Sequence, residues 1–317
     1  MVGEPFAPNT FDEGELGHAC ERIRAKLPAN AEPTNPAKLR DCDSEALYYG
    51  IGVPKDLERA RACALAEFGR RQEHLVFGGA SILMMIYANG DGLPANFELA
   101  ARYACDFGGA PAELASRLAH LDRMRASYEP ERLDVCDHAT SGLLSGFCAK
   151  HEARIADVAR ADRKRKAVVS LPPKELERFE RAAKAFIETR VNNEVDLSGT
   201  LRAAFQIEEE QKLADAQVEL LEKLPDPAFP RADGDKSTEA ELKRLYESAV
   251  KNLPQKTDMD LPGQIAAAGV KKTQRIWLQY REAWIALGIK VRPDKPREVW
   301  SDVLTRARIA MLKELAD

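Results

Sequence analysis

Apolar residues recur at helical spacing along the C-terminal half of the chain. In one segment they fall at i, i+3, i+7 and i+10, as Trp277, Tyr280, Trp284 and Leu287. In another they fall four residues apart, as Val303, Ala307, Met311 and Leu315. Each set forms one apolar stripe on a helix. Aromatic residues make up only 7% of the 317 residues, whereas Ala, Leu, Glu, Lys and Arg are abundant. This composition favours helices over a β-sandwich or barrel, so we predict an all-α fold.

Two helical hairpins repeat in the N-terminal half. The segment 47–60 reads LYYGIGVPKDLERA and the segment 87–100 reads YANGDGLPANFELA, with two glycines, a proline, a glutamate and an alanine recurring at an offset of 40. The glycines allow the positive φ that ends a helix, and the proline fits the start of the next helix. These glycines are Gly50 and Gly52 in the first copy and Gly90 and Gly92 in the second. They follow a helical pattern rather than a strand, which excludes a dinucleotide-binding turn.

These residues resemble the Sel-like repeat, a relative of the tetratricopeptide repeat. Its pattern places a Tyr three residues before the Gly-x-Gly and an Ala eight residues after the second Gly, as Tyr87 and Ala100 stand here. In the first copy Leu47 takes the Tyr position. The resemblance implies an array of helical hairpins over 38–125, after an N-terminal segment at 1–37, and arrays of this type generally bind other proteins.

The second half of the chain repeats at an offset of 91. FIETR at 186–190 matches WLQYR at 277–281, and LADAQVELLEKL at 213–224 matches LTRARIAMLKEL at 304–315. We predict two copies of one three-helix motif, at 136–225 and 238–317. The stretch PDPAFPRADGDK at 225–236 holds three prolines and a glycine, which is typical of a linker, and we place the linker at 226–237.

The string KKTQRIWLQYREAW at 271–284 resembles the lysozyme inhibitor LprI-like family of bacterial envelope proteins. Gln274, Trp277 and Arg281 match the Gln-x-x-Trp-x-x-x-Arg helix of that family, and Phe186 and Arg190 take the Trp and Arg positions in the first copy. The segment 308–312 matches the Arg-x-x-x-Leu end of the final helix, but neither copy has the cysteine that members often carry after the motif arginine. The resemblance implies a periplasmic or secreted protein and, for some members, inhibition of lysozyme.

The motif side chains have a structural and a functional interpretation. Their apolar stripes place the motif aromatics Phe186, Trp277, Tyr280 and Trp284 in the core. Arg190 and Arg281 follow Phe186 and Trp277 by four residues, so each lies one turn along the same face. We expect both arginines to pair with carboxylates or to cap carbonyls of a neighbouring helix, and recognition of a partner is the alternative.

All six cysteines lie in the first 148 residues: Cys20, Cys42, Cys63, Cys105, Cys136 and Cys148. An even number gathered in one half is typical of a disulfide framework and favours an oxidising compartment, although the sequence alone allows fifteen pairings. Cys136, His138, Cys148 and His151 are also spaced as zinc ligands, so a cytosolic zinc-containing interaction protein is an alternative.

The LprI-like resemblance favours a disulfide between Cys136 and Cys148 over zinc, which leaves His138 and His151 as surface residues and no metal site. Cys42 and Cys63 fall at similar heights of the first helical hairpin, which predicts a second pair. The third pair, Cys20 with Cys105, follows by exclusion.

Charge and motif content narrow the function. With 47 basic and 51 acidic residues the net charge is -4, so we expect no nucleic-acid partner. The longest apolar run, at 79–88, is too short to span a membrane. The N-terminus lacks the basic and apolar regions of a secretory signal, so we expect any signal peptide to be absent from this chain. HExxH, GxSxG and P-loop motifs are missing, which predicts a protein that is not an enzyme and needs no cofactor.

We therefore expect a periplasmic or secreted protein that binds another protein, of the lysozyme-inhibitor type. An inhibitor of a glycosidase would insert an acidic or polar loop into the substrate cleft, and the turn-rich segment 256–263 carries Asp258 and Asp260. These two aspartates, with Arg190 and Arg281, are the candidate binding residues. A periplasmic scaffold that organises protein partners without inhibiting lysozyme is the alternative.

Overall fold

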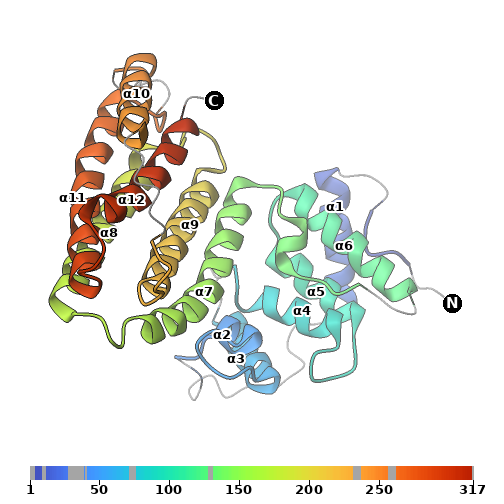
Figure 1. The fold of residues 1–317 in the computed structure, drawn as a ribbon. Helices are drawn as coiled ribbons and strands as arrows, with labels where there is room; N and C mark the ends of the chain where they lie inside the picture. Colours follow the sequence, from blue (N-terminus) through green and yellow to red (C-terminus); the bar gives the residue numbers. More distant parts are fainter. Residues whose placement is uncertain are drawn as a thin grey trace. The chain divides into compact units, whose positions relative to one another are not determined.

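A computed structural model describes residues 4–8, 12–27, 39, 41–70, 76–127, 131–230, 237–255 and 262–315. Within these ranges the chain forms helices α1 to α12 and one short 3-10 turn, and no strand (Figure 1). The all-α fold predicted from the composition is confirmed. None of the described helices has both the length and the apolar character needed to cross a membrane.

The chain divides into two compact units, residues 1–154 and 155–317. The first unit contains α1 (Glu13–Lys26), α2 (Ser44–Tyr49), α3 (Leu57–Gly69), α4 (Ala80–Asn89), α5 (Phe97–Phe107), α6 (Pro111–Ala126), the 3-10 turn η2 (Val135–His138) and the start of α7 (Gly142–Ala167). The centre of this unit is α4, in which all seven residues from Ile82 to Ala88 are buried. A helix that is apolar on every side can lie only in a core.

The two predicted hairpin turns have the same geometry. Gly50 ends α2 and Gly90 ends α4, both in the left-handed conformation, with φ of 80° and 69°. After each turn, the backbone N–H of the next N-cap residue returns to the ending helix: Asp56 donates to the Leu47 carbonyl at 2.9 Å, and Asn96 donates to the Tyr87 carbonyl at 2.8 Å. Equivalent hydrogen bonds recur 40 residues apart, so the local sequence pattern is sufficient to define both turns. The assignment of these hairpins to a repeat family remains a prediction.

Three disulfides connect elements of the first unit. Cys20 of α1 pairs with Cys105 of α5, Cys42 pairs with Cys63 of α3, and Cys136 of η2 pairs with Cys148 of α7. These are the three pairs that the sequence predicted. They close loops of 85, 21 and 12 residues, so the first unit contains one long-range and two local cross-links.

The second unit is built around a long helix pair. It contains the end of α7, then α8 (Pro173–Asn193), α9 (Arg202–Lys223), α10 (Ser237–Asn252), α11 (Ala267–Val291) and α12 (Arg297–Lys313). The helices α8 and α11 lie along each other, α9 packs on α8, and α10 and α12 pack on α11 and on each other (Figure 1). Gly288 of α11 permits the closest approach in this core, because a Cβ atom there would lie 2.3 Å from the Trp300 ring of α12.

The unit boundary differs from the predicted start of the first LprI-like copy at residue 136. Residues 136–154 belong to the first unit because the Cys136–Cys148 disulfide joins η2 to α7. In addition, His151 and Arg154 of α7 both bind Glu45 of α2. The remainder of the first predicted copy packs with the second copy in one unit.

The described part of the predicted linker packs against the core of the second unit. Residues 226–230 of the stretch 226–237 are described, and the Phe229 ring lies 6.2 Å from Trp300 and 6.4 Å from Trp284 between ring centroids. The Asp226 carbonyl accepts a hydrogen bond from Arg292 at 3.3 Å. The proline-rich composition therefore predicted the break between helices but missed the aromatic anchor.

Candidate functional site

The motif aromatics meet between α8 and α11. Phe186 of α8 stacks on Tyr280 of α11 with ring centroids 5.2 Å apart, and Phe186 and Trp277 are only 2% and 1% exposed. One turn later on α11, the Trp284 indole donates to the Trp300 carbonyl at 3.1 Å. All four aromatics lie in the core, where the sequence expected them.

A small apolar groove lies between α9 and α12, above these rings. Its volume is about 160 Å³, and Phe186, Trp277 and Tyr280 form its base. Its walls are mostly apolar, with Leu213, Ala216 and Leu220 on α9 and Val303, Ala307 and Met311 on α12. Two charged residues of α9, Glu219 and Lys223, also line it. Ala216 and Ala307 are both exposed, and their short side chains leave the space between the two helices unfilled.

A buried ionic cluster lies beside the same helices. The Arg308 guanidinium of α12 makes two 2.6 Å bonds to the Glu194 carboxylate, which follows α8, and both side chains are fully buried. Arg308 also donates to the Gln274 side-chain oxygen at 3.0 Å. The motif glutamine therefore positions a buried arginine from the final helix.

Arg190 completes this cluster. Its guanidinium binds Glu194 at 2.9 Å, Glu209 at 2.6 Å and Glu314 at 2.8 Å, and its side chain is 2% exposed. Burial alone would lower the pKa of Arg190, but the three carboxylates outweigh burial and raise it. All three guanidinium nitrogens are used, so Arg190 has the placement of a structural residue rather than of one that faces a partner.

Arg281 occupies the equivalent motif position with different contacts. Its guanidinium lies 4.6 Å from the centroid of the Trp277 ring, and it donates to Glu239 of α10 at 2.6 Å and to Thr305 of α12 at 3.2 Å. The side chain remains 14% exposed, so Arg281 joins the aromatic base to the surface of α10. The other two candidate binding residues, Asp258 and Asp260, lie outside the described residues.

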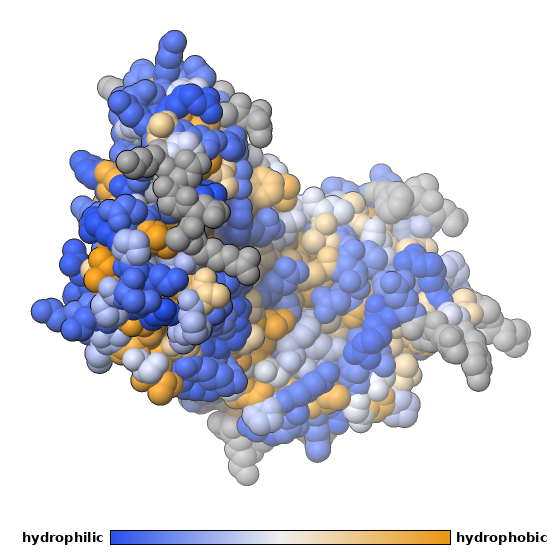
Figure 2. Space-filling model, in the orientation of Figure 1, coloured by the Kyte–Doolittle hydropathy of each residue, from blue (hydrophilic) through white to orange (hydrophobic). Residues whose placement is uncertain are grey.

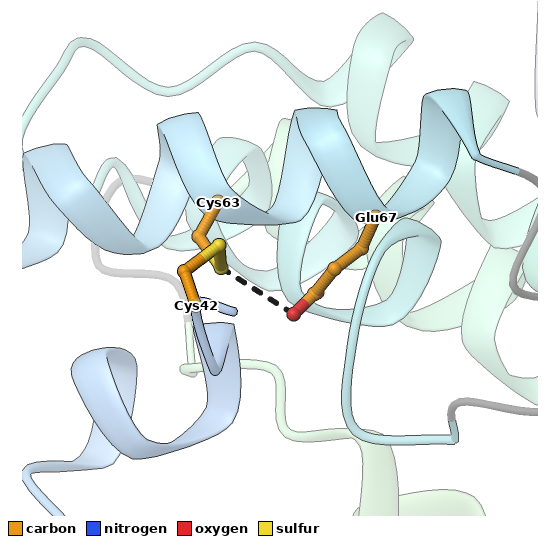
Figure 3. A group of neighbouring side chains, drawn as sticks. All are labelled: Cys42, Cys63 and Glu67. Carbon is orange, nitrogen blue, oxygen red and sulfur yellow. Dashed lines mark hydrogen bonds between the residues drawn. A yellow bond between two sulfur atoms is a disulfide. The ribbon is translucent and has the colours of Figure 1, made fainter. Parts of the chain in front are cut away.

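In the first unit, Cys42, Cys63 and Glu67 place three potential metal-ligand atoms within 4.8 Å of one another (Figure 3). The two sulfurs are joined as a disulfide, so they carry no thiolate for a metal. The Glu67 carboxylate points toward the disulfide and accepts bonds from the Ser44 backbone N–H at 3.1 Å, the Ser44 hydroxyl at 2.5 Å and the Gly79 N–H at 2.9 Å. Glu67 therefore ties the starts of α2 and α4 to α3.

His138 is half-buried, and the expectation that His151 is a surface residue is wrong. His151 is 6% exposed, stacks on Phe77 at 4.2 Å between centroids, and lies 2.6 Å from the Glu45 carboxylate. Burial lowers the pKa of His151, and Asp134 and Glu152 partly oppose this. His138 lies 3.0 Å from His120. The neighbours of His151 come from α2 and from the segment before α4, so its burial depends on residues distant in the sequence.

Sequence reasoning also missed Glu194 as the centre of the ionic cluster. Arg308 was part of the recognised Arg-x-x-x-Leu pattern, but its carboxylate partner lies 114 residues earlier. The one local signal was the four-residue spacing of Arg190 and Glu194, which on a helix brings the two side chains together.

In comparisons with known proteins, no family model, no curated protein and no solved structure matches this chain. The resemblances to the Sel-like and LprI-like families therefore rest on the quoted motif residues alone.

Proposed function

We propose that this protein binds another protein through the groove between α9 and α12, and that it is an inhibitor of the lysozyme type that acts in the periplasm or outside the cell. The observation that carries the proposal is the apolar groove of about 160 Å³ over Phe186, Trp277 and Tyr280. An apolar cavity of roughly 150 Å³ accommodates a benzene ring. The groove thus has the size for one aromatic or branched side chain of a partner, and anchors of this kind dominate the energy of protein interfaces.

Two further features support the proposal. The base of the groove is made of residues in the motif that resembles the LprI-like family, so the groove and the resemblance involve the same part of the chain. The three disulfides favour an oxidising compartment, where lysozymes act on the cell wall.

The test is a titration of the oxidised protein against c-type, g-type and i-type lysozymes, with muramidase turnover as the readout. We expect stoichiometric inhibition of one type. Ala307→Phe, which fills the groove, should abolish inhibition, whereas Ala310→Phe, at an exposed position of the same helix outside the groove, should retain it. Circular dichroism melting of both variants controls for folding.

The outcomes separate the parts of the proposal. Failure to inhibit any lysozyme would exclude the lysozyme assignment, and equal inhibition by both phenylalanine variants would exclude the groove. The acidic segment is a separate candidate contact: unchanged inhibition after alanine replaces both Asp258 and Asp260 would dismiss it.

A periplasmic scaffold is the second candidate. The observation that favours it is the pair of hairpins α2–α3 and α4–α5 with equivalent turns, because stacked hairpins commonly bind proteins along their length. This candidate predicts binding partners that depend on the first unit, together with no effect on muramidase turnover.

A further inference from the structure

A second groove in the C-terminal unit lies between α10 and α11 and has a different chemistry. Its volume is about 350 Å³, and basic side chains dominate its lining: Lys243 on α10, and Lys271, Arg275 and Arg281 on α11. Glu239 is the single carboxylate among the described lining residues, and it is already bound to Arg281 at 2.6 Å. The groove is therefore positive, although the chain as a whole carries a net charge of -4.

Two of the basic side chains have no partner within the described part of the chain. Lys271 and Arg275 are both exposed, and neither forms an ion pair with a described residue. Lys243 has only a long contact of 3.9 Å to Glu247, whose side chain is 63% exposed. These charges remain available to a ligand, because a weak surface ion pair costs little to break.

The groove also contains apolar surface. Leu278 of α11 is 41% exposed, and Tyr246 of α10 lies half-buried on the opposite wall. The visible face of the second unit is mostly hydrophilic, with apolar side chains in small separate patches (Figure 2). The exposed Leu278 beside two cations that pair with no described residue favours a ligand that carries both negative charge and an apolar group.

Spacing along α11 defines this ligand further. Lys271, Arg275 and Leu278 follow one face of the helix, with axial separations of about 6 Å and about 4.5 Å at 1.5 Å per residue. Alternate side chains of an extended peptide point to the same side and lie about 7 Å apart. Two acidic residues at alternate positions can therefore reach Lys271 and Arg275, and the next residue on that side reaches Leu278.

We propose that the α10–α11 groove binds an acidic segment of a protein in extended conformation, with two carboxylates on Lys271 and Arg275 and an apolar side chain on Leu278. This site is separate from the α9–α12 groove and does not depend on the proposed inhibition of lysozyme. A larger hollow of about 710 Å³ between α8 and α11 is a weaker candidate, because Glu175 and Glu177 lie among its basic residues and no aromatic side chain lines it.

The test uses the full oxidised chain and a fluorescein-labelled decapeptide, with fluorescence anisotropy as the readout. The peptide carries Glu, Glu and Leu at three successive alternate positions and Ser elsewhere, and the control peptide has Gln in place of each Glu. We expect saturable, salt-sensitive binding of the acidic peptide only. Lys271→Glu or Arg275→Glu should weaken binding by about tenfold, because each places like charges together.

Lys272→Glu is the matched control. Lys272 lies on the same turn of α11, is exposed and does not line the groove, so its reversal should change the affinity by less than about twofold. Leu278→Ser should weaken peptide binding without changing the binding of sulfated dextran, which has no apolar group. Circular dichroism melting confirms that each variant is folded.

Three results would overturn the proposal. The first is no binding of the acidic peptide at low salt. The second is an equal loss in Lys271→Glu and Lys272→Glu, which would show a diffuse charge effect. The third is peptide binding that Leu278→Ser leaves unchanged while sulfated dextran binds more tightly, which would make the groove a site for an anionic polysaccharide.

Discussion

Glu194 is the side chain on which the buried ionic cluster of the second unit depends. It is fully buried and binds both Arg308 and Arg190. Glu194→Gln keeps the shape of the side chain but removes its charge. Arg190 would retain Glu209 and Glu314, whereas Arg308 would keep only the neutral side chain of Gln274 and whatever the new glutamine offers.

The size of the effect follows from the loss of Glu194, which is the only counterion of Arg308 among the described residues. Breaking a buried ion pair by removing one partner costs about 3–5 kcal/mol, because the remaining charge is left in a medium of low polarity. We therefore expect Glu194→Gln to lower the free energy of unfolding of the second unit by about 3–5 kcal/mol. Glu314→Gln is the matched control: this carboxylate is 50% exposed and Arg190 keeps its other partners, so the expected loss is below about 1 kcal/mol.

Tryptophan fluorescence during urea unfolding measures this prediction selectively. All three tryptophans, Trp277, Trp284 and Trp300, are buried in the second unit, and the first unit has none. The signal therefore reports the unit that contains Glu194 without interference from the other. A loss for Glu194→Gln as small as that for Glu314→Gln would refute the argument, because it would mean that Arg308 is solvated or paired without Glu194.

Two further predictions concern the first unit, where all three disulfides lie. Chemical reduction of the disulfides should destabilise the first unit, because the disulfides that close loops of 21 and 85 residues each contribute about 3–5 kcal/mol in the chain-entropy model. The unfolding transition followed by circular dichroism should therefore shift, whereas the midpoint followed by tryptophan fluorescence should stay unchanged. A parallel shift of both signals would contradict this. Burial lowers the pKa of His151 below its ordinary 6.5, so the folded state favours the neutral imidazole. The contribution of His151 to the free energy of unfolding is therefore fully present above about pH 6.5 and is lost as the pH falls through the pKa of the folded state. The circular dichroism midpoint in urea should therefore fall between pH 7 and pH 5, and by less in His151→Gln; an identical fall in the variant would assign the effect to other groups.

Features fixed by neighbouring residues were predictable from the sequence. The turns after α2 and α4 depend on Gly50 and Gly90 and on residues within ten positions of each, and the structure forms both. The Cys42–Cys63 disulfide followed in the same way, because a helical hairpin brings positions on either side of its turn to similar heights. Apolar spacing was likewise sufficient to bury Trp277 and Trp284.

Features that depend on distant partners were not predictable in this way. The sequence predicts a surface position for His151, but Glu45, which lies 106 residues earlier, contacts its ring nitrogen. The groove between α9 and α12 depends on two alanines from different helices and on how far apart those helices pack. A hydrophobic pattern identifies the apolar face of each helix but gives no distance between the faces.

The two motif arginines show where a repeat stops being informative. Arg190 and Arg281 stand at equivalent positions, each one turn after a core aromatic, and the repeat correctly predicts that both pair with carboxylates. One difference between the two sites is the residue one turn further along. Directly after α8 that residue is Glu194, which binds Arg190 in the buried cluster. On α11 it is the buried Ile285, and Arg281 binds Glu239 from α10 and lies over the Trp277 ring. Residues outside the shared motif, Glu194 among them, therefore place one arginine in the core and the other in the wall of a surface groove.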